Sequence, residues 1–195
     1  ETFALALQNH QKNNLQAAEQ LYKEILEIEP DHIESIFYLG SLSIQIGNFD
    51  RAKQLLNKTI QIDPNHAQAY NNLGAIAFQK LKKNQEAISY YEKAIQINPN
   101  FASAHYNLGT VFKELEEFPK AISCYEKAIQ IDSNFINAYN NLGTILGDLN
   151  RLDEAKKYLE KSLNVDPNAK KTNENYGNLL LKLNQHNKAI EYIRK

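Results

Sequence analysis

Residues 69–74 read AYNNLG, and the same six residues return at 138–143. Glycine recurs with a matching period along most of the chain, at Gly40, Gly74, Gly109, Gly143 and Gly177. Proline, replaced once by serine, follows the same period at Pro30, Pro64, Pro99, Ser133 and Pro167. The spacings in both series are 34 or 35 residues. A period of this length predicts an array of stacked repeats, each of them one supersecondary unit.

Each unit contains two amphipathic helical patterns. In residues 102–115 the apolar side chains recur at i, i+4, i+7, i+8 and i+11, which predicts a first helix. These side chains are Ala104, Leu108, Val111, Phe112 and Leu115. Residues 116–119, "EEFP", break the chain before a second pattern in residues 120–131. The second pattern carries an alanine in every unit, at Ala18, Ala52, Ala87, Ala121, Ala155 and Ala189, with an aromatic or aliphatic residue four positions later.

The turns have signatures of their own. We expect Asp50, Asp153 and Asn187 to cap the second helices of their units, because short polar side chains accept hydrogen bonds from helix N-termini. The third unit has one extra residue within "LKKNQ", residues 81–85, which predicts a longer inner turn. Ser133 replaces the usual proline, but the surrounding "DSN" can still form a turn.

The recurring glycine lies in the middle of the first helix, where it costs about 1 kcal/mol relative to alanine. Its repetition predicts a close approach between the two helices of a unit. The small alanine of the second helix is the expected partner.

These residues resemble the tetratricopeptide repeat, with Leu-Gly in the first helix, alanine and then an aromatic residue in the second, and a terminal proline. The resemblance covers essentially the whole chain. It divides residues 1–195, as a single array, into units 1–32 (start truncated), 33–66, 67–101, 102–135, 136–169 and 170–195 (incomplete). It implies an all-α, right-handed superhelical solenoid of antiparallel helix pairs, whose first helices line a concave surface.

Composition limits the function classes. The chain has 195 residues, of which 43% are hydrophobic and 23% charged, and its formal net charge is −1. The near-neutral charge argues against nucleic-acid binding, which needs a concentrated basic surface. No apolar run reaches the length of a membrane span. The single cysteine, Cys124, excludes an internal disulfide and is compatible with a cytoplasmic location. The absence of methionine indicates a piece of a longer protein.

In such an array the binding residues are those of the first helices that face away from the second helices. We expect them at positions 2, 5, 6, 9 and 13 of the units. The candidates for peptide binding are Asn72, Asn107, Asn141, Asn175, Asn71, Asn140, Tyr38, Phe37, Tyr106, Thr110, Thr144, Gln68, Asn137 and Asn178.

Asparagine at position 6 forms what we call the asparagine ladder: Asn72, Asn107, Asn141 and Asn175. A carboxamide can pair with both the C=O and the N–H of another backbone. One carboxamide per unit, roughly 9 Å apart at usual helix spacings, matches about three residues of an extended peptide. The ladder therefore predicts binding of an extended polypeptide with little regard for its side chains. The alternative is that these amides bond between adjacent repeats or face water.

The position-6 asparagines look most like the repeat arm of O-linked N-acetylglucosamine transferases and their bacterial relatives. In that family the matching amides hold extended protein substrates, and the catalytic domain lies beyond the repeats. Tyr38 departs from the pattern. Another subfamily, the carboxylate clamp, requires Lys and Asn at positions 5 and 9 of one unit and basic residues at positions 2 and 6 two units later. No three consecutive units of this sequence contain that set, so a carboxylate clamp is not expected.

No constellation for catalysis, metal binding or a cofactor emerges. His32 and His66 occupy the same repeat position one repeat apart and do not converge. Cys124 is expected to be a buried, inert thiol. The alternatives left open are a peptide-binding module, the substrate arm of a larger modifying enzyme, and a scaffold that forms homo-oligomers through its C-terminal end, where Ile190 and Ile193 are expected to lack a cover.

Overall fold

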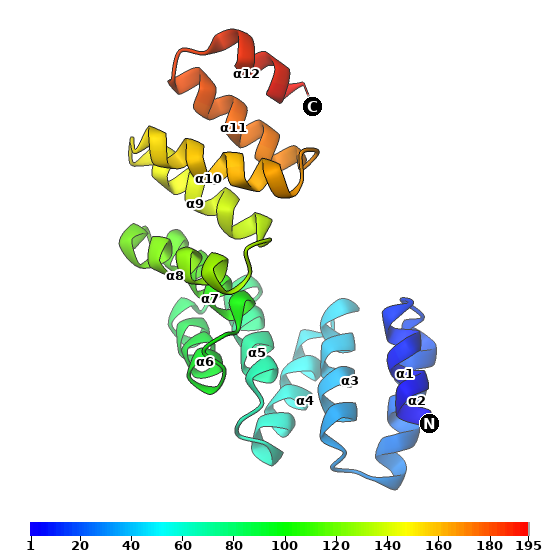
Figure 1. The fold of residues 1–195 in the computed structure, drawn as a ribbon. Helices are drawn as coiled ribbons and strands as arrows, with labels where there is room; N and C mark the ends of the chain where they lie inside the picture. The colour runs from blue at the N-terminus through cyan, green and yellow to red at the C-terminus, as the bar shows by residue number, and fades with distance from the viewer. Residues whose placement is uncertain (195) are drawn as a thin grey trace. The chain divides into compact units, whose positions relative to one another are not determined.

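The computed structural model describes residues 1–194, and these residues form twelve α-helices (Figure 1). The helices are α1 (Thr2–Gln11), α2 (Leu15–Ile28), α3 (Ile33–Gln45), α4 (Phe49–Ile62), α5 (Ala67–Gln79), α6 (Asn84–Ile97), α7 (Ala102–Glu114), α8 (Phe118–Ile131), α9 (Ile136–Asp148), α10 (Leu152–Val165), α11 (Lys170–Lys182) and α12 (His186–Ile193). Odd-numbered helices are the first helices of the predicted units, and even-numbered helices are the second.

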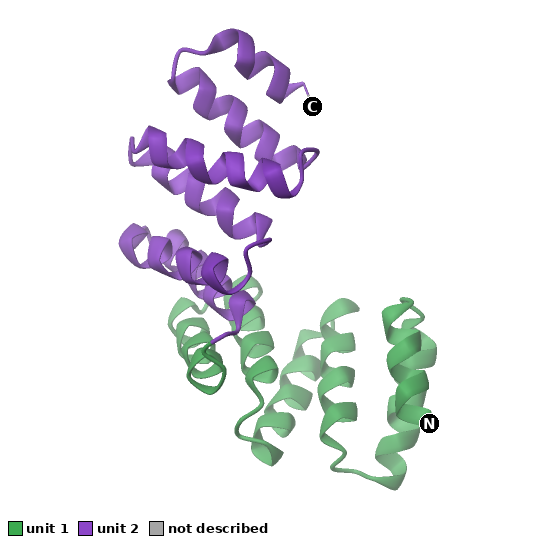
Figure 2. Cartoon of the chain, viewed as in Figure 1, with its two compact units in different colours: residues 1–99 green, residues 100–195 purple. Residues whose placement is uncertain are grey.

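The chain divides into two compact units, Glu1–Pro99 and Asn100–Lys195, shown in Figure 2. Unit 1 holds α1 to α6 and unit 2 holds α7 to α12. The division falls within two residues of the predicted border between the third and fourth repeats. The organisation of residues 1–195 as one continuous right-handed superhelix stays a prediction.

Within each unit the helices pack first in pairs and then pair against pair. The second helix of one pair packs on the first helix of the next, as α2 does on α3 and α10 on α11. First helices also contact one another, α1 with α3 and α9 with α11. The prediction of an all-α array of helix pairs is confirmed.

The turns inside the pairs share one conformation. Five of them have three residues, and each contains one residue with positive φ: Asn13, Gly47, Glu116, Asn150 or Asn184. The turn between α5 and α6 has four residues, Lys80 to Lys83. The prediction of a longer turn in the third repeat is confirmed.

Three of the turns between repeats share one aspartate hydrogen bond. Asp63 Oδ1 accepts a hydrogen bond of 2.9 Å from the backbone N–H of Asn65, and Asp166 makes the same bond with Asn168. Asp132 makes it with Asn134 across Ser133, also at 2.9 Å. The "DSN" segment therefore turns without proline, as predicted.

Two predictions about helix ends were wrong. Asp50, Asp153 and Asn187 are each the second residue of their helix and not its cap. The side chain that caps α4 belongs to Asn48, which accepts from Arg51 N at 3.2 Å. Leu115, expected on the apolar stripe, lies just beyond α7 and is 39% exposed because the helix ends at Glu114.

The core follows the repeat pattern. All six repeated alanines are buried, as are the large side chains that follow them in the first five repeats. The recurring glycine faces that large side chain: a Cβ at Gly74 would lie 2.7 Å from Tyr91 Cε1, and one at Gly143 would lie 2.6 Å from Leu159 Cγ. The expected close approach exists, but its nearest partner is the side chain one turn after the alanine.

Candidate functional site

All predicted site residues lie on the first helices α3, α5, α7, α9 and α11, but they differ in burial. Gln68, Asn137 and Asn178 are exposed. Phe37, Tyr38, Asn71, Asn72, Tyr106, Asn107, Thr110, Thr144 and Asn175 are half-buried. Asn140 and Asn141 are buried, with exposed fractions of 2% and 6%.

In unit 1 the amide of Asn72 reaches back to the preceding repeat. Its Nδ2 donates to Ser41 Oγ at 3.2 Å, which joins α5 to α3. Tyr38, where the asparagine pattern is broken, instead stacks on the buried ring of Tyr22, with centroids 6.1 Å apart and planes at 10°. At position 6 the second repeat therefore packs an aromatic ring, whereas repeats three to six carry an asparagine.

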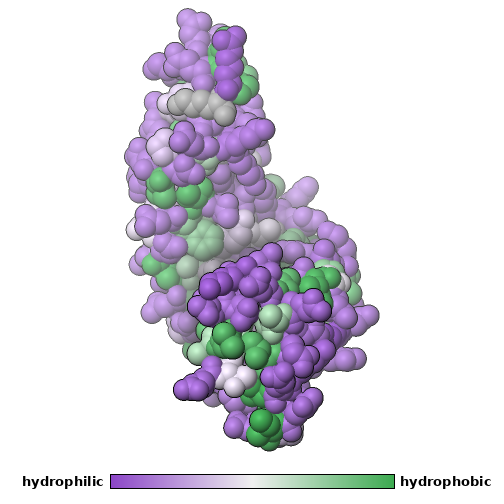
Figure 3. Space-filling model, turned by 90° about the vertical axis from the view of Figure 1, so that its right-hand side faces the viewer, coloured by the Kyte–Doolittle hydropathy of each residue, from purple (hydrophilic) through white to green (hydrophobic). Residues whose placement is uncertain are grey.

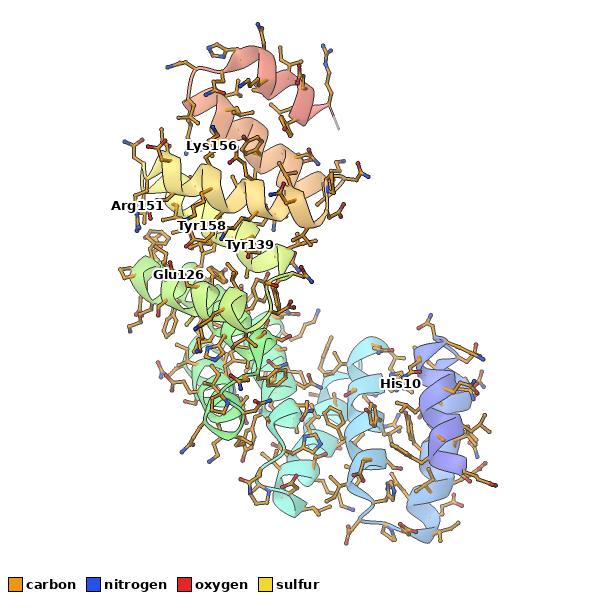
Figure 4. All side chains as sticks on the ribbon, viewed as in Figure 1. His10, Glu126, Tyr139, Arg151, Lys156 and Tyr158 are labelled. Atoms are coloured by element: carbon orange, nitrogen blue, oxygen red, sulfur yellow. The ribbon has the colours of Figure 1, made fainter. Side chains whose placement is uncertain are left out.

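His10 on α1, labelled in Figure 4, belongs to the same aromatic cluster. Its Nδ1 lies 3.3 Å from Tyr22 Oη. Burial lowers the pKa of His10, and burial also raises the pKa of Tyr22 to about 12. Both groups are thus held in their neutral forms.

In unit 2 Asn141 bonds to two tyrosines. Its Nδ2 donates to Tyr125 Oη at 3.2 Å and to Tyr106 Oη at 3.3 Å. Tyr125 in turn donates to Thr110 Oγ1 at 3.3 Å. Burial raises the pKa of Tyr125 to about 12. The amide therefore links the first helix of one repeat to both helices of the repeat before it.

A second amide network lies between α9 and α11. Asn175 Nδ2 donates to Asn140 Oδ1 and to Thr144 Oγ1, both at 3.2 Å. Asn140 Nδ2 donates to Thr172 Oγ1 at 2.8 Å, and Thr172 contacts Ser162 Oγ at 3.0 Å. Both ends of the Asn140 amide are therefore bonded inside the array.

These bonds bear on the two alternatives for the amides. The NH₂ groups of Asn72, Asn140, Asn141 and Asn175 all bond to a neighbouring repeat. Bonding between repeats is thus a real role of these side chains. Contact with a peptide stays a prediction, and it concerns the carbonyl oxygens and the exposed neighbours.

Two pockets open on the first helices, one in each unit. The pocket in unit 1 has a volume of about 830 Å³ and is lined by Leu7, His10, Gln11, Asn13, Leu15, Tyr38, Ser41 and Gln45. The pocket in unit 2 has a volume of about 330 Å³ and is lined by Gly143, Thr144, Gly147, Asp148, Leu159, Asn175, Asn178, Leu179 and Lys182. Sequence reasoning missed Gly147 and Lys182. The sequence feature that could have indicated this pocket is Gly147, the second glycine of α9.

The histidines have a structural role that the sequence reasoning also missed. His32 Nδ1 accepts from Ser35 N, and His66 Nδ1 accepts from Ala69 N, both at 3.2 Å. Each imidazole thus caps the first helix of its repeat. Within residues 1–194 no group of three His, Cys, Asp or Glu side chains is placed to hold a metal ion. Cys124 is half-buried rather than buried.

The second helices of unit 2 carry a polar surface. Tyr158 on α10 donates to Glu126 on α8 at 3.2 Å, and its ring lies 6.3 Å from the ring of Tyr139. Figure 4 labels the three residues. The face of the molecule in Figure 3 is mostly hydrophilic, with apolar side chains in small separate patches.

None of the helices in residues 1–194 has the length and apolar content needed to cross a membrane. The cytoplasmic location stays a prediction.

The sequence matches three family models, all described as tetratricopeptide repeat. They cover residues 10–76, residues 65–134 and 100–168, and residues 171–195. The chain belongs to the tetratricopeptide repeat family. No curated protein sequence matches it.

Solved structures of other tetratricopeptide repeat proteins agree. The crystal structure of MamA shares 33% identity with a TM-score of 0.71, over 83% of this chain and 94% of that one. PilF of Pseudomonas aeruginosa has a TM-score of 0.89 at 19% identity, over 98% of this chain and 86% of that one. YrrB, described as a TPR protein with an unusual peptide-binding site, has a TM-score of 0.70 at 23% identity, over 88% of each chain. The latter two matches show the fold alone.

Proposed function

We propose that this chain is a protein-interaction module that binds an extended polypeptide segment on the face of its first helices. The proposal rests on the hydrogen bonds that fix the side-chain amides of the asparagine ladder. Asn72 and Asn175 each use their NH₂ group for the preceding repeat and remain half-buried. A carboxamide also has a carbonyl acceptor. An amide fixed through its NH₂ group keeps that oxygen for the backbone N–H of a bound peptide.

The composition of this face supports main-chain recognition. Among the fifteen residues at positions 5, 6 and 9 of the last five repeats, only Glu174 is charged. Hydroxyls and amides dominate instead, and these groups pair well with peptide groups. The YrrB structure indicates that the same fold can carry a peptide-binding site.

Asn140 and Asn141 are not expected to contact the peptide directly. Their NH₂ groups are bonded and their side chains are buried. We assign them to fixing the neighbouring side chains Asn175 and Tyr106, and leave the direct contacts to the half-buried and exposed residues.

The test starts from a random dodecapeptide library displayed on phage and selected on the purified chain. Affinities of the enriched peptides are then measured by titration calorimetry. Asn72→Ala or Asn175→Ala should weaken binding about two- to tenfold, the worth of one hydrogen bond. Asn164→Ala, an exposed asparagine on α10, is the matched control and should change nothing. Failure to enrich any peptide, or equal affinity of all three variants, would contradict the proposal.

A narrower version makes the chain the substrate-holding arm of a larger modifying enzyme. It rests on the likeness of the position-6 asparagines to the repeat arm of O-linked N-acetylglucosamine transferases. The reading frame on both sides of the segment tests it. A neighbouring glycosyltransferase domain would support the arm, and a complete frame without any enzyme domain would remove it.

A second candidate function is self-association through α12. Ile190 and Ile193 on this helix are 45% and 46% exposed. If the helix binds a second copy, light scattering should show a mass that rises with concentration, and Ile190→Lys should abolish the rise. A strict monomer at high concentration would exclude this function and leave peptide binding untouched.

A further inference from the structure

Gly147 is the second glycine of α9, and helix packing does not require it. A Cβ at Gly143 would lie 2.6 Å from Leu159 Cγ, whereas one at Gly147 would come no closer than 3.8 Å to any neighbour, Leu179 Cδ1 being the nearest. The same repeat position holds His10, Ile44, Phe78, Lys113 and Leu181 in the other five repeats. Gly147 is thus the one member of this series without a side chain, and the space beside its Cα is not filled by a side chain of its own.

That space is part of the pocket of about 330 Å³ between α9 and α11. Its apolar lining comes from the two glycines with Leu159 and Leu179. Its polar lining comes from Thr144, Asn175 and Asn178, which belong to the predicted peptide-binding face, and from Asp148 and Lys182. The pocket thus opens where a peptide held by Asn175 would pass.

The charged groups of the pocket are already paired with each other. Lys182 Nζ donates to Asp148 Oδ1 at 3.2 Å and to the backbone oxygen of Gly147 at 3.0 Å. The Asn175 amide is likewise held by Thr144. This pair is exposed at the rim, so a charged side chain that enters the apolar part of the pocket beside Leu159 and Leu179 would lose water without gaining a partner, which is unfavourable. An aliphatic side chain carries no charge and therefore does not incur this cost.

We infer that this pocket is a specificity subsite that takes one aliphatic side chain, of about leucine size, from the bound peptide. A volume at the low end of the range for ligand pockets suits one side chain better than a larger ligand. The inference rests on the proposed peptide binding and deepens it. The ladder holds the main chain, and the absence of a side chain at Gly147 selects the residue.

The test uses the peptides enriched from the dodecapeptide library on the wild-type chain. Their sequences should share an aliphatic residue at one position. Gly147→Leu fills the pocket and should weaken their binding about 10- to 100-fold, the worth of burying one such side chain. Gly147→Ala, whose Cβ makes only ordinary contacts, is the matched control and should keep most of the affinity.

Folding is checked by circular dichroism, because both substitutions replace a helical glycine and should raise the melting temperature. If Gly147→Leu does not fold, Asn178→Phe at the exposed rim serves as the second blocking variant. Replacing the shared aliphatic residue of the peptide by alanine should weaken binding to the wild type and have little effect on Gly147→Leu.

The outcomes separate the two proposals. Enriched peptides that bind Gly147→Leu as tightly as the wild type, or that share no aliphatic residue, would overturn the subsite and leave peptide binding intact. Failure to enrich any peptide would overturn both.

Discussion

At the residue scale, two glycines one turn apart on α9 have opposite roles. A Cβ at Gly143 would clash with Leu159, while a Cβ at Gly147 would make only ordinary van der Waals contacts, the nearest at 3.8 Å. We predict that Gly143→Ala lowers the free energy of unfolding by about 1–3 kcal/mol despite its better helix propensity. Gly147→Ala should raise it by about 0.5–1 kcal/mol. Urea denaturation measures both, and equal effects of the two substitutions would contradict the packing described here.

Tyr125 makes stability depend on alkaline pH. Burial raises its pKa to about 12, whereas tyrosine in the unfolded chain ionises near pH 10. The stabilisation is therefore complete below about pH 10 and is lost as the pH rises toward 12. Tyr125→Phe removes this titration at the expense of the bonds to Thr110 and Asn141. Between pH 10 and 12 the wild type should lose about 2 kcal/mol more stability than the variant in urea titrations.

The sequence predicts the residues of the core better than those of the polar networks. Repeated alanine and the aromatic residue four positions later need only periodicity to be placed in the core, and they are buried. The partners of Asn141 are two tyrosines in the preceding repeat, 16 and 35 residues away. Such bonds depend on how neighbouring repeats stack, which a single repeat pattern does not contain.

At the element scale, an imidazole cap couples helix α5 to acidic pH. Burial lowers the pKa of His66, so the folded state prefers the neutral ring, whose Nδ1 accepts from Ala69 N. This stabilisation is present above about pH 6.5 and is lost as the pH falls through the lower folded pKa. His66→Asn keeps an acceptor at the cap and removes the titration.

The measurement is the melting temperature between pH 7 and 5. His66→Asn should flatten the acid loss that the wild type shows, while His186→Asn, at an exposed histidine of α12, should leave it unchanged. Parallel curves for wild type and His66→Asn would show that the cap does not control acid stability.

The caps of the second helices give a separate prediction. Asn48→Ala removes the bond to Arg51 N and should cost about 1 kcal/mol. Asp50→Ala removes only a favourable charge in the first turn of α4 and should cost less, about 0.3–1 kcal/mol. Chemical denaturation of the two variants compares them, and a larger loss for Asp50→Ala would restore the original sequence prediction.

Helices and turns were predicted from the sequence more reliably than caps. The extra residue in "LKKNQ" and the turn at "DSN" behave as expected because chain length and Asx geometry are local properties. A cap can be assigned only when the first residue of the helix is known. The sequence prediction placed the cap of α4 two residues too late, at Asp50 instead of Asn48. The histidine caps at His32 and His66 carry no comparable sequence signal, because an imidazole accepts a hydrogen bond only in its neutral form.

At the scale of the whole molecule, helices differ strongly in how much of them is buried. Nine of the thirteen residues of α9 are buried, whereas α12 buries only Ala189. Because repeats contact only their neighbours, local opening should follow this difference. Hydrogen exchange should be slowest in α9 and fastest in α12, and equal protection of the two helices would indicate a cover on α12 such as a second copy.

At this scale the proposed peptide binding uses the first helices as one surface within each unit. Periodicity and the resemblance to the tetratricopeptide repeat placed the candidate residues on these helices, and the structure adds the bonds that hold the amides and the pocket at Gly147. The second glycine of α9 is visible in the sequence, but the pocket itself depends on how α9, α10 and α11 pack, which the repeat pattern does not contain. The pattern shared by all repeats gives the scaffold, and we propose that the departure at Gly147 gives the specificity.

The most direct test of peptide binding observes the side-chain NH₂ signals of asparagine in ¹H–¹⁵N spectra while a library-selected peptide is added. The account predicts shifts for Asn72, Asn175 and Asn178 on the first helices and none for Asn57 and Asn164 on the second helices. Shifts confined to the second helices or to α12, with the first-helix signals unchanged, would contradict it.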